Sequence, residues 1–271
     1  MFNKTEKELL LKLFRVYAPS QKEDSVLSII KEVLTAIGVK FQTNKFGNIY
    51  CLNHKNAPLL SAHTDCVGTP EAGHYVRFIN FYKYGSDEIL KGIGNIGGDD
   101  KCGVFLILLA LINGLKVNAF FSVCEEIGGA DGIRTILEDV ENDKIFKSIP
   151  YCIVIDRKGN GDIISSSNGY CSKEFENEIA KIGEKYNYKP CLGGCSDMNS
   201  IKAYMNGCNI STGYYNPHTN QEYVSMNDLF NTWNYLQDII QNLPRNIPLK
   251  KETVVVNNTQ KTYNDNWWEM V

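Results

Sequence analysis

Histidine and carboxylate side chains follow short apolar segments at several places in this chain, where they could bind a metal ion or move a proton. The first pair is His63 and Asp65, directly after the apolar run 58–62. His63 could bind a metal through one ring nitrogen, while Asp65 accepts the proton of the other nitrogen and fixes the tautomer. A His-x-Asp triplet is common by chance, so this pair taken alone is better interpreted as a hydrogen-bonded surface turn.

Two adjacent carboxylates, Asp99 and Asp100, lie in a glycine-rich segment before an apolar run. They repel one another, and burial beside apolar sequence requires a cation to offset the cost of desolvation. A bound metal is one candidate for that cation and Lys101 is another. A solvated loop that caps the following helix is the simpler interpretation. The glycines around the pair favour an unusual backbone path near a bound group.

Glu125 and Glu126 follow the apolar run 117–123 and precede a glycine turn. One glutamate could bind a metal while its neighbour, pointing elsewhere, takes or gives protons. Asp156 occupies the same position relative to its own apolar run, 151–155. An acidic pair is usually a solvated surface, and an Asp at a strand end is usually a turn residue. Neither motif is decisive by itself.

The combination of these residues is more specific than any one of them. Two of the four histidines, His63 and His218, occur at such positions together with Asp99, Glu126 and Asp156. Imidazole and carboxylate ligands suit zinc, cobalt or manganese, and two ions bridged by one carboxylate need a set of this kind. We therefore predict a site for two divalent metal ions. The histidines at positions 54 and 74 lack such partners and are predicted to be structural or exposed.

The elements that must position these residues are short apolar strands alternating with helices. Helical spacing predicts two helices in the first forty residues and further helices over about 102–114, 174–187 and 227–242. Buried strands that alternate with helices predict a largely parallel sheet covered on both faces. The ligand crevice of such a sheet lies at the carboxyl ends of its strands, which is where the candidate ligands fall.

Composition and charge argue against several other classes of function. The 271 residues carry 28 Lys and Arg against 31 Asp and Glu, a formal net charge of −3, whereas a nucleic-acid binder needs a basic surface. The first residues lack the apolar core of a signal peptide, and the longest apolar run, 104–112, is far shorter than the ~20 residues of a membrane span. We therefore expect a cytoplasmic protein whose nine cysteines are reduced.

Taken in order, the motifs resemble those of the co-catalytic zinc exopeptidases, in particular the peptidase T-type tripeptidases and the aminoacylase and carboxypeptidase group. The resemblance extends over roughly residues 8–242. The matching segments are 63–65, 98–103, 125–128, 156 and 214–218, with further matches at 18–23, 46–48 and 193–197. The resemblance implies a three-layer α/β/α sandwich with a largely parallel mixed central sheet, the phosphorylase/hydrolase-like fold of zinc exopeptidases.

The resemblance also implies a role for each candidate residue. Five side chains would hold two divalent ions, zinc with cobalt or manganese as alternatives: His63 and Asp156 on one ion, Glu126 and His218 on the other, and Asp99 bridging both. Asp65 would orient His63, and Glu125 would be the general base. The peptide bond between Asp99 and Asp100 would be cis.

One departure from these families concerns a lid or dimerisation domain, which tripeptidases and aminoacylases carry after the strand that ends at the residue matching Asp156. Only about forty residues separate Asp156 from Asp197 here. We therefore predict a catalytic domain over 1–247 without a lid, as a monomer or in an oligomer that does not use one. Residues 248–271 would form a tail with an edge strand and an aromatic anchor. Without a lid, the candidates by position for oxyanion binding are Tyr214, Tyr215 and Asn216.

The sequence therefore predicts a metallo-exopeptidase that hydrolyses short peptides and has no nucleic-acid or membrane partner. Two alternatives stay open. A deacylase of N-acyl amino acids or similar small amides would use the same site, and an inactive binding protein would keep the same fold. The presence of all five ligands and the base argues against the inactive protein.

Overall fold

The computed structural model of the protein describes residues 1–68, 78–127 and 130–249. The predicted tail over 248–271 lies almost wholly outside these residues, as do His74 and the glycines at 128 and 129. The helices are α1 (Lys4–Phe14), α2 (Asp24–Ala36), α3 (Gly98–Ile112), α4 (Ala130–Val140), α5 (Lys173–Gly183), α6 (Met198–Ile201) and α7 (Met226–Asn242). The strands are β1 (Gln42–Thr43), β2 (Ile49–Cys51), β3 (Leu59–His63), β4 (Asn80–Tyr84), β5 (Asp87–Lys91), β6 (Asn118–Ser122), β7 (Tyr151–Arg157), β8 (Asp162–Ile164), β9 (Lys189–Cys191), β10 (Asn206–Ser211), β11 (Tyr214–Tyr215) and β12 (Tyr223–Ser225).

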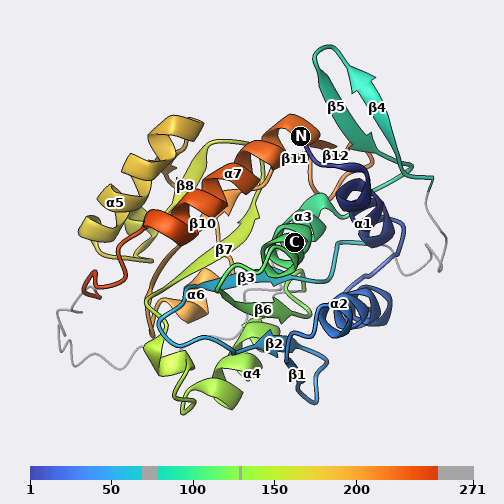
Figure 1. Ribbon diagram of the computed structural model, residues 1–271. Coiled ribbons are helices and arrows are strands. Elements are labelled where there is room, and N and C mark those ends of the chain that lie inside the picture. Colours follow the sequence, from blue (N-terminus) through green and yellow to red (C-terminus); the bar gives the residue numbers. More distant parts are fainter. Residues whose placement is uncertain (69–77, 128–129, 250–271) are drawn as a thin grey trace, which may run out of the picture.

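An eight-stranded mixed sheet forms the centre of the molecule, with the order β1-β2-β6-β3-β7-β10-β8-β9 (Figure 1). Its four central strands, β6, β3, β7 and β10, are parallel to one another. Antiparallel pairing occurs toward the edges, where β1 pairs with β2, β2 with β6, and β8 with β10. The predicted largely parallel mixed sheet is therefore confirmed.

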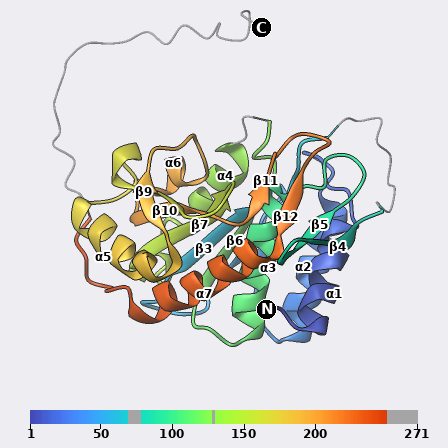
Figure 2. The same cartoon turned by 90° about the horizontal axis from the view of Figure 1, so that it is seen from above.

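Side chains of the central strands alternate between two hydrophobic cores, one on each face of the sheet. In β3, Leu60 and Ala62 join the core built with α1, α2, α3, α5 and α7, whereas Leu59 joins the core built with α4 and α6. In β6, Phe121 and Phe120 divide between the cores in the same way. This period of two buries both faces of the sheet and gives the predicted three layers, which Figure 2 shows from above.

Strand β3 marks the point where the chain changes direction across the sheet. The chain leaves β3 through α3 to reach β6 on one side, then returns through α4 to reach β7 on the other side. Because α3 and α4 pack on opposite faces, the connections diverge at β3 and open a crevice at the carboxyl ends of these strands. The polar residues after β3, β6 and β7 all lie beside this crevice.

A second sheet was not predicted from the sequence. It is antiparallel, with the order β11-β12-β5-β4, and its β4–β5 hairpin projects at the upper right of Figure 1. Strand β4 is largely exposed on both faces, so it lacks the alternation by which a half-buried strand is recognised. The sheet matters for function because the loop between β11 and β12 carries His218.

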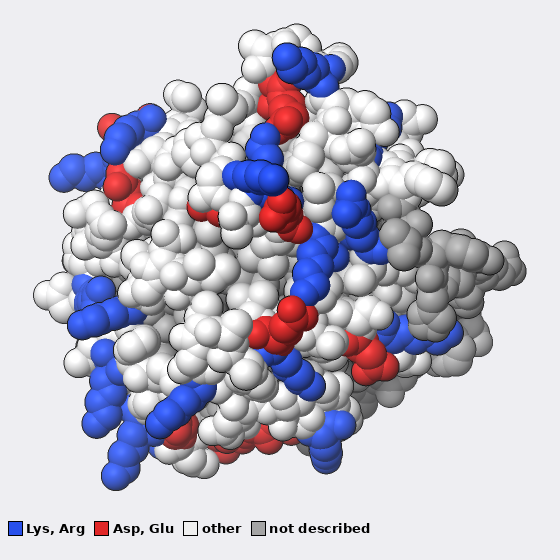
Figure 3. All heavy atoms as spheres, turned by 45° about the vertical axis from the view of Figure 1, so that its right-hand side comes forward, with Lys and Arg blue, Asp and Glu red and all other residues white. Residues whose placement is uncertain are grey.

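Residues 158–197, between β7 and α6, include β8, α5 and β9. These elements extend the main sheet and cover its edge. None of the described helices is both long and apolar enough to cross a membrane. On the face drawn in Figure 3, acidic and basic side chains are interspersed over the described residues rather than gathered into one basic surface.

Gly103 allows α3 to lie close against β7. A Cβ atom at this position would come within 2.2 Å of the Ile155 carbonyl oxygen and 2.6 Å of Asp100 Oδ1. We expect Gly103→Ala to lower the free energy of unfolding by about 1–3 kcal/mol, because the helix must move away from the strand. Urea unfolding of the metal-free protein measures this change. Gly194→Ala is the control, since a Cβ there would have no atom within 4 Å; equal midpoints for the two variants would contradict the packing argument.

Candidate active site

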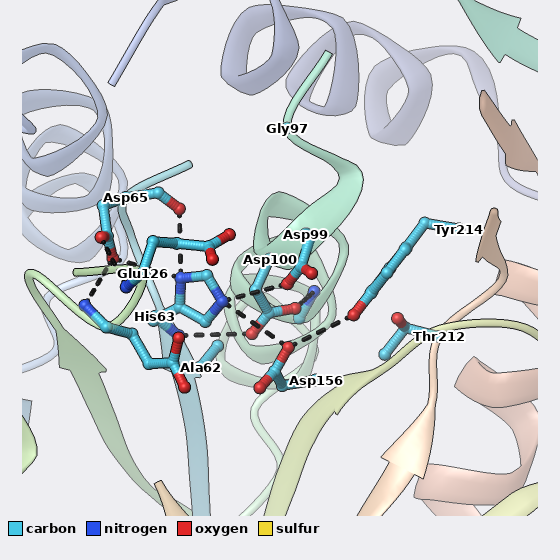
Figure 4. A network of polar contacts seen from close by, with 12 residues as sticks. Ala62, His63, Asp65, Gly97, Asp99, Asp100, Glu126, Asp156, Thr212 and Tyr214 are labelled. Carbon is cyan, nitrogen blue, oxygen red and sulfur yellow. Dashed lines mark hydrogen bonds and ion pairs between the residues drawn. The ribbon is translucent and has the colours of Figure 1, made fainter. Parts of the chain in front are cut away.

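His63 lies at the centre of a cluster of carboxylates (Figure 4). Its Nε2 is 3.1 Å from Asp99 Oδ1 and 3.6 Å from Asp156 Oδ1. Its Nδ1 is 3.2 Å from Asp65 Oδ1, so one ring nitrogen faces the cluster and the other faces Asp65. This is the arrangement in which a carboxylate accepts the proton of one nitrogen and leaves the other nitrogen free to bind a metal.

His218 approaches the same cluster from the second sheet. Its Nε2 is 3.2 Å from Asp99 Oδ2 and 3.0 Å from Glu126 Oε1. The two oxygens of Asp99 therefore face different histidines, each with a further carboxylate beside it. The peptide bond between Asp99 and Asp100 is cis, as the resemblance implied.

Asp65 holds both glutamates of the loop after β6 as well as His63. Its Oδ1 accepts a hydrogen bond from the backbone N–H of Glu125, and its Oδ2 accepts one from that of Glu126, each at 3.0 Å. The Ser20 hydroxyl donates a further hydrogen bond to Oδ2 at 2.6 Å. Burial opposes ionisation, but the hydrogen bond and charge of His63 and these further donors lower the pKa of Asp65 to about 2. Asp65 is therefore an ionised carboxylate whose oxygens are already occupied by protein donors.

Asp156 and Glu126 lack comparable compensation. Burial, followed by the charge of Asp99, raises the pKa of Asp156 well above its usual value. Burial raises the pKa of Glu126 to about 7, although the charge of His63 opposes this shift. Burial also lowers the pKa of His63, but the hydrogen bond and charge of Asp156, together with Asp65 and Asp99, outweigh it and hold that pKa well above its usual range. Negative charge at Asp156 and Glu126 is thus costly without a cation.

Several residues of this cluster are candidate metal ligands. Glu126 Oε1 is buried and receives no hydrogen bond of acceptable geometry from the described residues, although His218 Nε2 lies 3.0 Å away. Two groups of three residues place one ligand atom each within 4.8 Å of one another: His63, Asp99 and Glu126 in the first, and His63, Asp100 and Asp156 in the second. Asp100 is the weaker candidate, because its two oxygens already accept hydrogen bonds from the N–H groups of His63 and Gly103.

Two residues that sequence reasoning missed hold the site in place. Glu222 is buried and accepts hydrogen bonds from the backbone N–H groups of Ile96, Gly97 and Asp99 at 2.8, 2.7 and 3.3 Å. Asn209, in β10, pairs with the backbone of Asp156 through both its side-chain oxygen and nitrogen. Neither residue lies next to another candidate ligand or directly after an apolar run. Nothing in their type or spacing therefore indicated a role at the site.

The three residues that were chosen by their sequence position as candidates for oxyanion binding have different surroundings in the structure. The Tyr214 hydroxyl donates a hydrogen bond of 3.4 Å to Asp156 Oδ1 and lines the cavity beside the cluster. The Tyr215 hydroxyl instead donates to Asp228 at 2.6 Å and is not among the cavity-lining residues. Asn216 lines the cavity, and its side-chain nitrogen donates to the Gln221 carbonyl at 3.4 Å. His54 precedes β3 and so lies at the end of that strand away from the cluster.

A cavity of about 470 Å³ opens beside the cluster. Its lining includes Glu125 together with the candidate ligands Asp99, Glu126, Asp156 and His218. Clefts of this size accommodate small ligands rather than folded proteins. The arrangement can therefore bring a small molecule to the carboxylates and to the metal ions that they would hold.

Comparison with known proteins identifies the fold. No family model matches the chain. A curated relative from Pyrococcus abyssi, provisionally named a LysW-lysine/LysW-ornithine hydrolase, is 28% identical over 182 residues, which cover 66% of this chain and 48% of the relative. The chain thus spans about half the length of the curated relative it matches.

Three solved structures share the architecture at low sequence identity. The aminopeptidase of the archaeon Desulfurococcus kamchatkensis is 17% identical, with a TM-score of 0.66 over 89% of this chain and 96% of that one. Aminopeptidase PepT of Bacillus cereus is 14% identical, with a TM-score of 0.64 over 87% and 98%. A tripeptidase of Staphylococcus aureus is 12% identical, with a TM-score of 0.66 over 89% and 98%. The chain therefore has the fold of these aminopeptidases and tripeptidases, as its motifs predicted.

Glu222 accepts hydrogen bonds from three N–H groups at and just before the start of α3, of which that of Gly97 also donates to Asn95 Oδ1. We expect Glu222→Ala to lower the free energy of unfolding by roughly 2–4 kcal/mol, because each unpaired buried donor costs about 1–3 kcal/mol. Glu222→Gln keeps a carbonyl acceptor and is expected to lose less. Urea unfolding of the metal-free protein measures both, with the exposed Glu138→Ala as the matched control. If Glu222→Ala unfolds at the same urea concentration as Glu138→Ala, the supporting role assigned to Glu222 is wrong.

Proposed function

We propose that this chain is a metallo-exopeptidase of the aminopeptidase or tripeptidase type, which hydrolyses short peptides. The observation that carries the proposal is the position of Asp99 between two histidines, with Oδ1 at 3.1 Å from His63 and Oδ2 at 3.2 Å from His218. A carboxylate in this position can bridge two ions, each with one histidine. The shared fold with aminopeptidases and a tripeptidase supports the same function.

The proposed ligands would hold two divalent ions, zinc with cobalt or manganese as alternatives. His63 and Asp156 would bind one ion, and Glu126 and His218 the other. When bound, such ions acidify a water molecule and polarise the carbonyl of the bond to be cleaved. Imidazole and carboxylate ligands without a thiolate are typical of these metals, and the candidate set contains no cysteine.

Glu125 is proposed as the general base. It lines the cavity beside the ligands, and its backbone N–H is held by Asp65. Burial raises the pKa of its carboxyl, as suits a group that must both accept and release a proton. Glu125 would take a proton from the attacking water and deliver it to the leaving nitrogen, so that the peptide bond is replaced by a free carboxylate and a free amine.

A second candidate function is the hydrolysis of another amide bond at the same site. The provisional name of the Pyrococcus abyssi relative, a LysW-lysine/LysW-ornithine hydrolase, favours a bond between LysW and lysine or ornithine as the one that is cleaved. A deacylase of N-acyl amino acids is a related possibility. Assays of free and N-blocked di- and tripeptides beside N-acyl amino acids separate these activities, since an aminopeptidase requires the free amino terminus. An inactive binding protein would hydrolyse none of them even after zinc or cobalt is added.

The proposed ligands predict the metal content of the protein. We expect about two zinc ions per chain after loading, and no more than about one in His63→Ala or His218→Ala, because each histidine belongs to a different ion. Inductively coupled plasma mass spectrometry of the dialysed protein measures the ratio. His54→Ala is the control and should retain both ions. Full metal content in both site variants would contradict the assignment.

Glu125→Ala tests the base separately from the metal. We expect this variant to retain both ions and to lose a factor of about 10²–10⁴ in kcat, which is the usual contribution of a positioned proton-transfer group. Steady-state hydrolysis of the best peptide substrate measures the loss, and Glu138→Ala should retain full activity. Undiminished turnover in Glu125→Ala would remove Glu125 from the mechanism.

A further inference from the structure

The cavity beside the cluster has two cationic side chains in its lining. Arg157 and Lys158 are the only Lys or Arg among the described residues that line it, and they follow Asp156 directly in the sequence. The rest of its charged lining is acidic apart from His218, which pairs with Asp99 and Glu126. The cavity thus combines the proposed metal site with a positively charged wall.

This wall has a fixed backbone. The Arg157 carbonyl accepts a hydrogen bond from the backbone N–H of Thr212 at 2.8 Å, and the Lys158 carbonyl accepts one from the Ser211 hydroxyl at 3.1 Å. Gly159 has a φ of +76° and donates its N–H to the Tyr214 carbonyl at 2.7 Å. The chain therefore turns sharply after β7 and is tied to the segment that leads to β11. Such a wall can present charges in a set position.

The charges of the wall are only partly neutralised by the protein. Arg157 Nε donates to Asp162 Oδ2 at 3.1 Å, which orients the guanidinium, but the structure records no acceptor for its terminal nitrogens among the described residues. Lys158 is exposed and forms no ion pair with any described residue. Two cations against one carboxylate leave this wall with one net positive charge.

We infer that Arg157 and Lys158 bind the free carboxylate of the substrate, so that the enzyme acts on di- and tripeptides with an unblocked carboxyl end. The inference rests on the proposed function and names the substrate class of that site. A free carboxylate is repelled by the acidic part of the cavity and attracted to this wall, where an arginine orients it through paired N–H groups and a lysine adds charge.

The spacing along β7 agrees with a short substrate. Successive residues of a strand advance by about 3.3 Å, so Lys158 begins about 7 Å beyond Asp156. An extended peptide advances by about the same distance per residue, so a carboxylate bound at Lys158 would lie within a few residues of a carbonyl bound beside Asp156. A cavity of about 470 Å³ accommodates a molecule of this length.

Hydrolysis of trialanine and of trialanine amide by the zinc-loaded enzyme tests the inference. We expect kcat/KM for the free acid to exceed that for the amide by about tenfold, equivalent to about 1.4 kcal/mol, mainly through KM. Lys158→Gln should remove most of this preference by raising KM for the acid, while Lys158→Arg should restore it. High salt should weaken binding of the acid alone, because Lys158 is exposed.

The controls separate failure of this inference from failure of the proposed function. Lys116→Gln alters an exposed lysine that precedes β6, at the end of the sheet away from the site, and should behave as wild type. Calorimetric titration of Glu125→Ala with both peptides measures the same preference without turnover. Equal hydrolysis of acid and amide by the wild type overturns the carboxylate site and leaves the peptidase intact. Hydrolysis of neither overturns both.

Discussion

The active-site region depends on holding several carboxylates close together where water is largely excluded. Such groups repel one another and lose hydration, so each needs a partner. The protein supplies partners to some of them: Asp65 accepts hydrogen bonds from the Ser20 hydroxyl and two backbone amides, and Glu222 accepts them from the start of α3. Other carboxylates of the cluster accept few such hydrogen bonds, and their oxygens face the histidines. These carboxylates are the ones available to a cation. Hydrogen bonding thus separates the residues that build the site from those that would bind metal.

The fold places this cluster by means of strand order. Because β3 lies between β6 and β7 and its flanking connections pack on opposite faces, three strand ends meet at one crevice. His63, the Glu125–Glu126 pair and Asp156 come from these three ends, although about ninety residues separate the first from the last. Asp99 enters from the first turn of α3, which packs on β3 and β7. The order of the strands and the packing of the connecting helices are therefore sufficient to bring together carboxylates that are distant in the sequence.

The strands of the main sheet and the residues at their ends were predictable, because buried parallel strands are continuous apolar runs that stop abruptly at polar residues. The start of α3 was predicted at 102 rather than Gly98, because the Gly98–Asp100 segment has no apolar periodicity. The second sheet was missed since its β4 strand is exposed, and Glu222 was missed since a single glutamate in a polar turn resembles a solvated one. His218 was a candidate ligand from its sequence position, but its pairing with Glu126 was implied only by the resemblance to exopeptidases, because the loop that carries it belongs to that second sheet.

The division of the cluster between two sheets has a consequence for how such a protein can diversify. The large sheet contributes His63, which is buried, and Asp156, which is partly buried, and both lie within 4 Å of other residues of the cluster. His218 and Glu222 come from the segment between β11 and β12 of a small antiparallel sheet, whose outermost strand, β4, is largely exposed. Substitutions at the exposed positions of β4 would leave the cavity unchanged, because no described residue of the β4–β5 hairpin lines it. The β4–β5 projection is therefore a place where lineages can vary without rebuilding the catalytic framework.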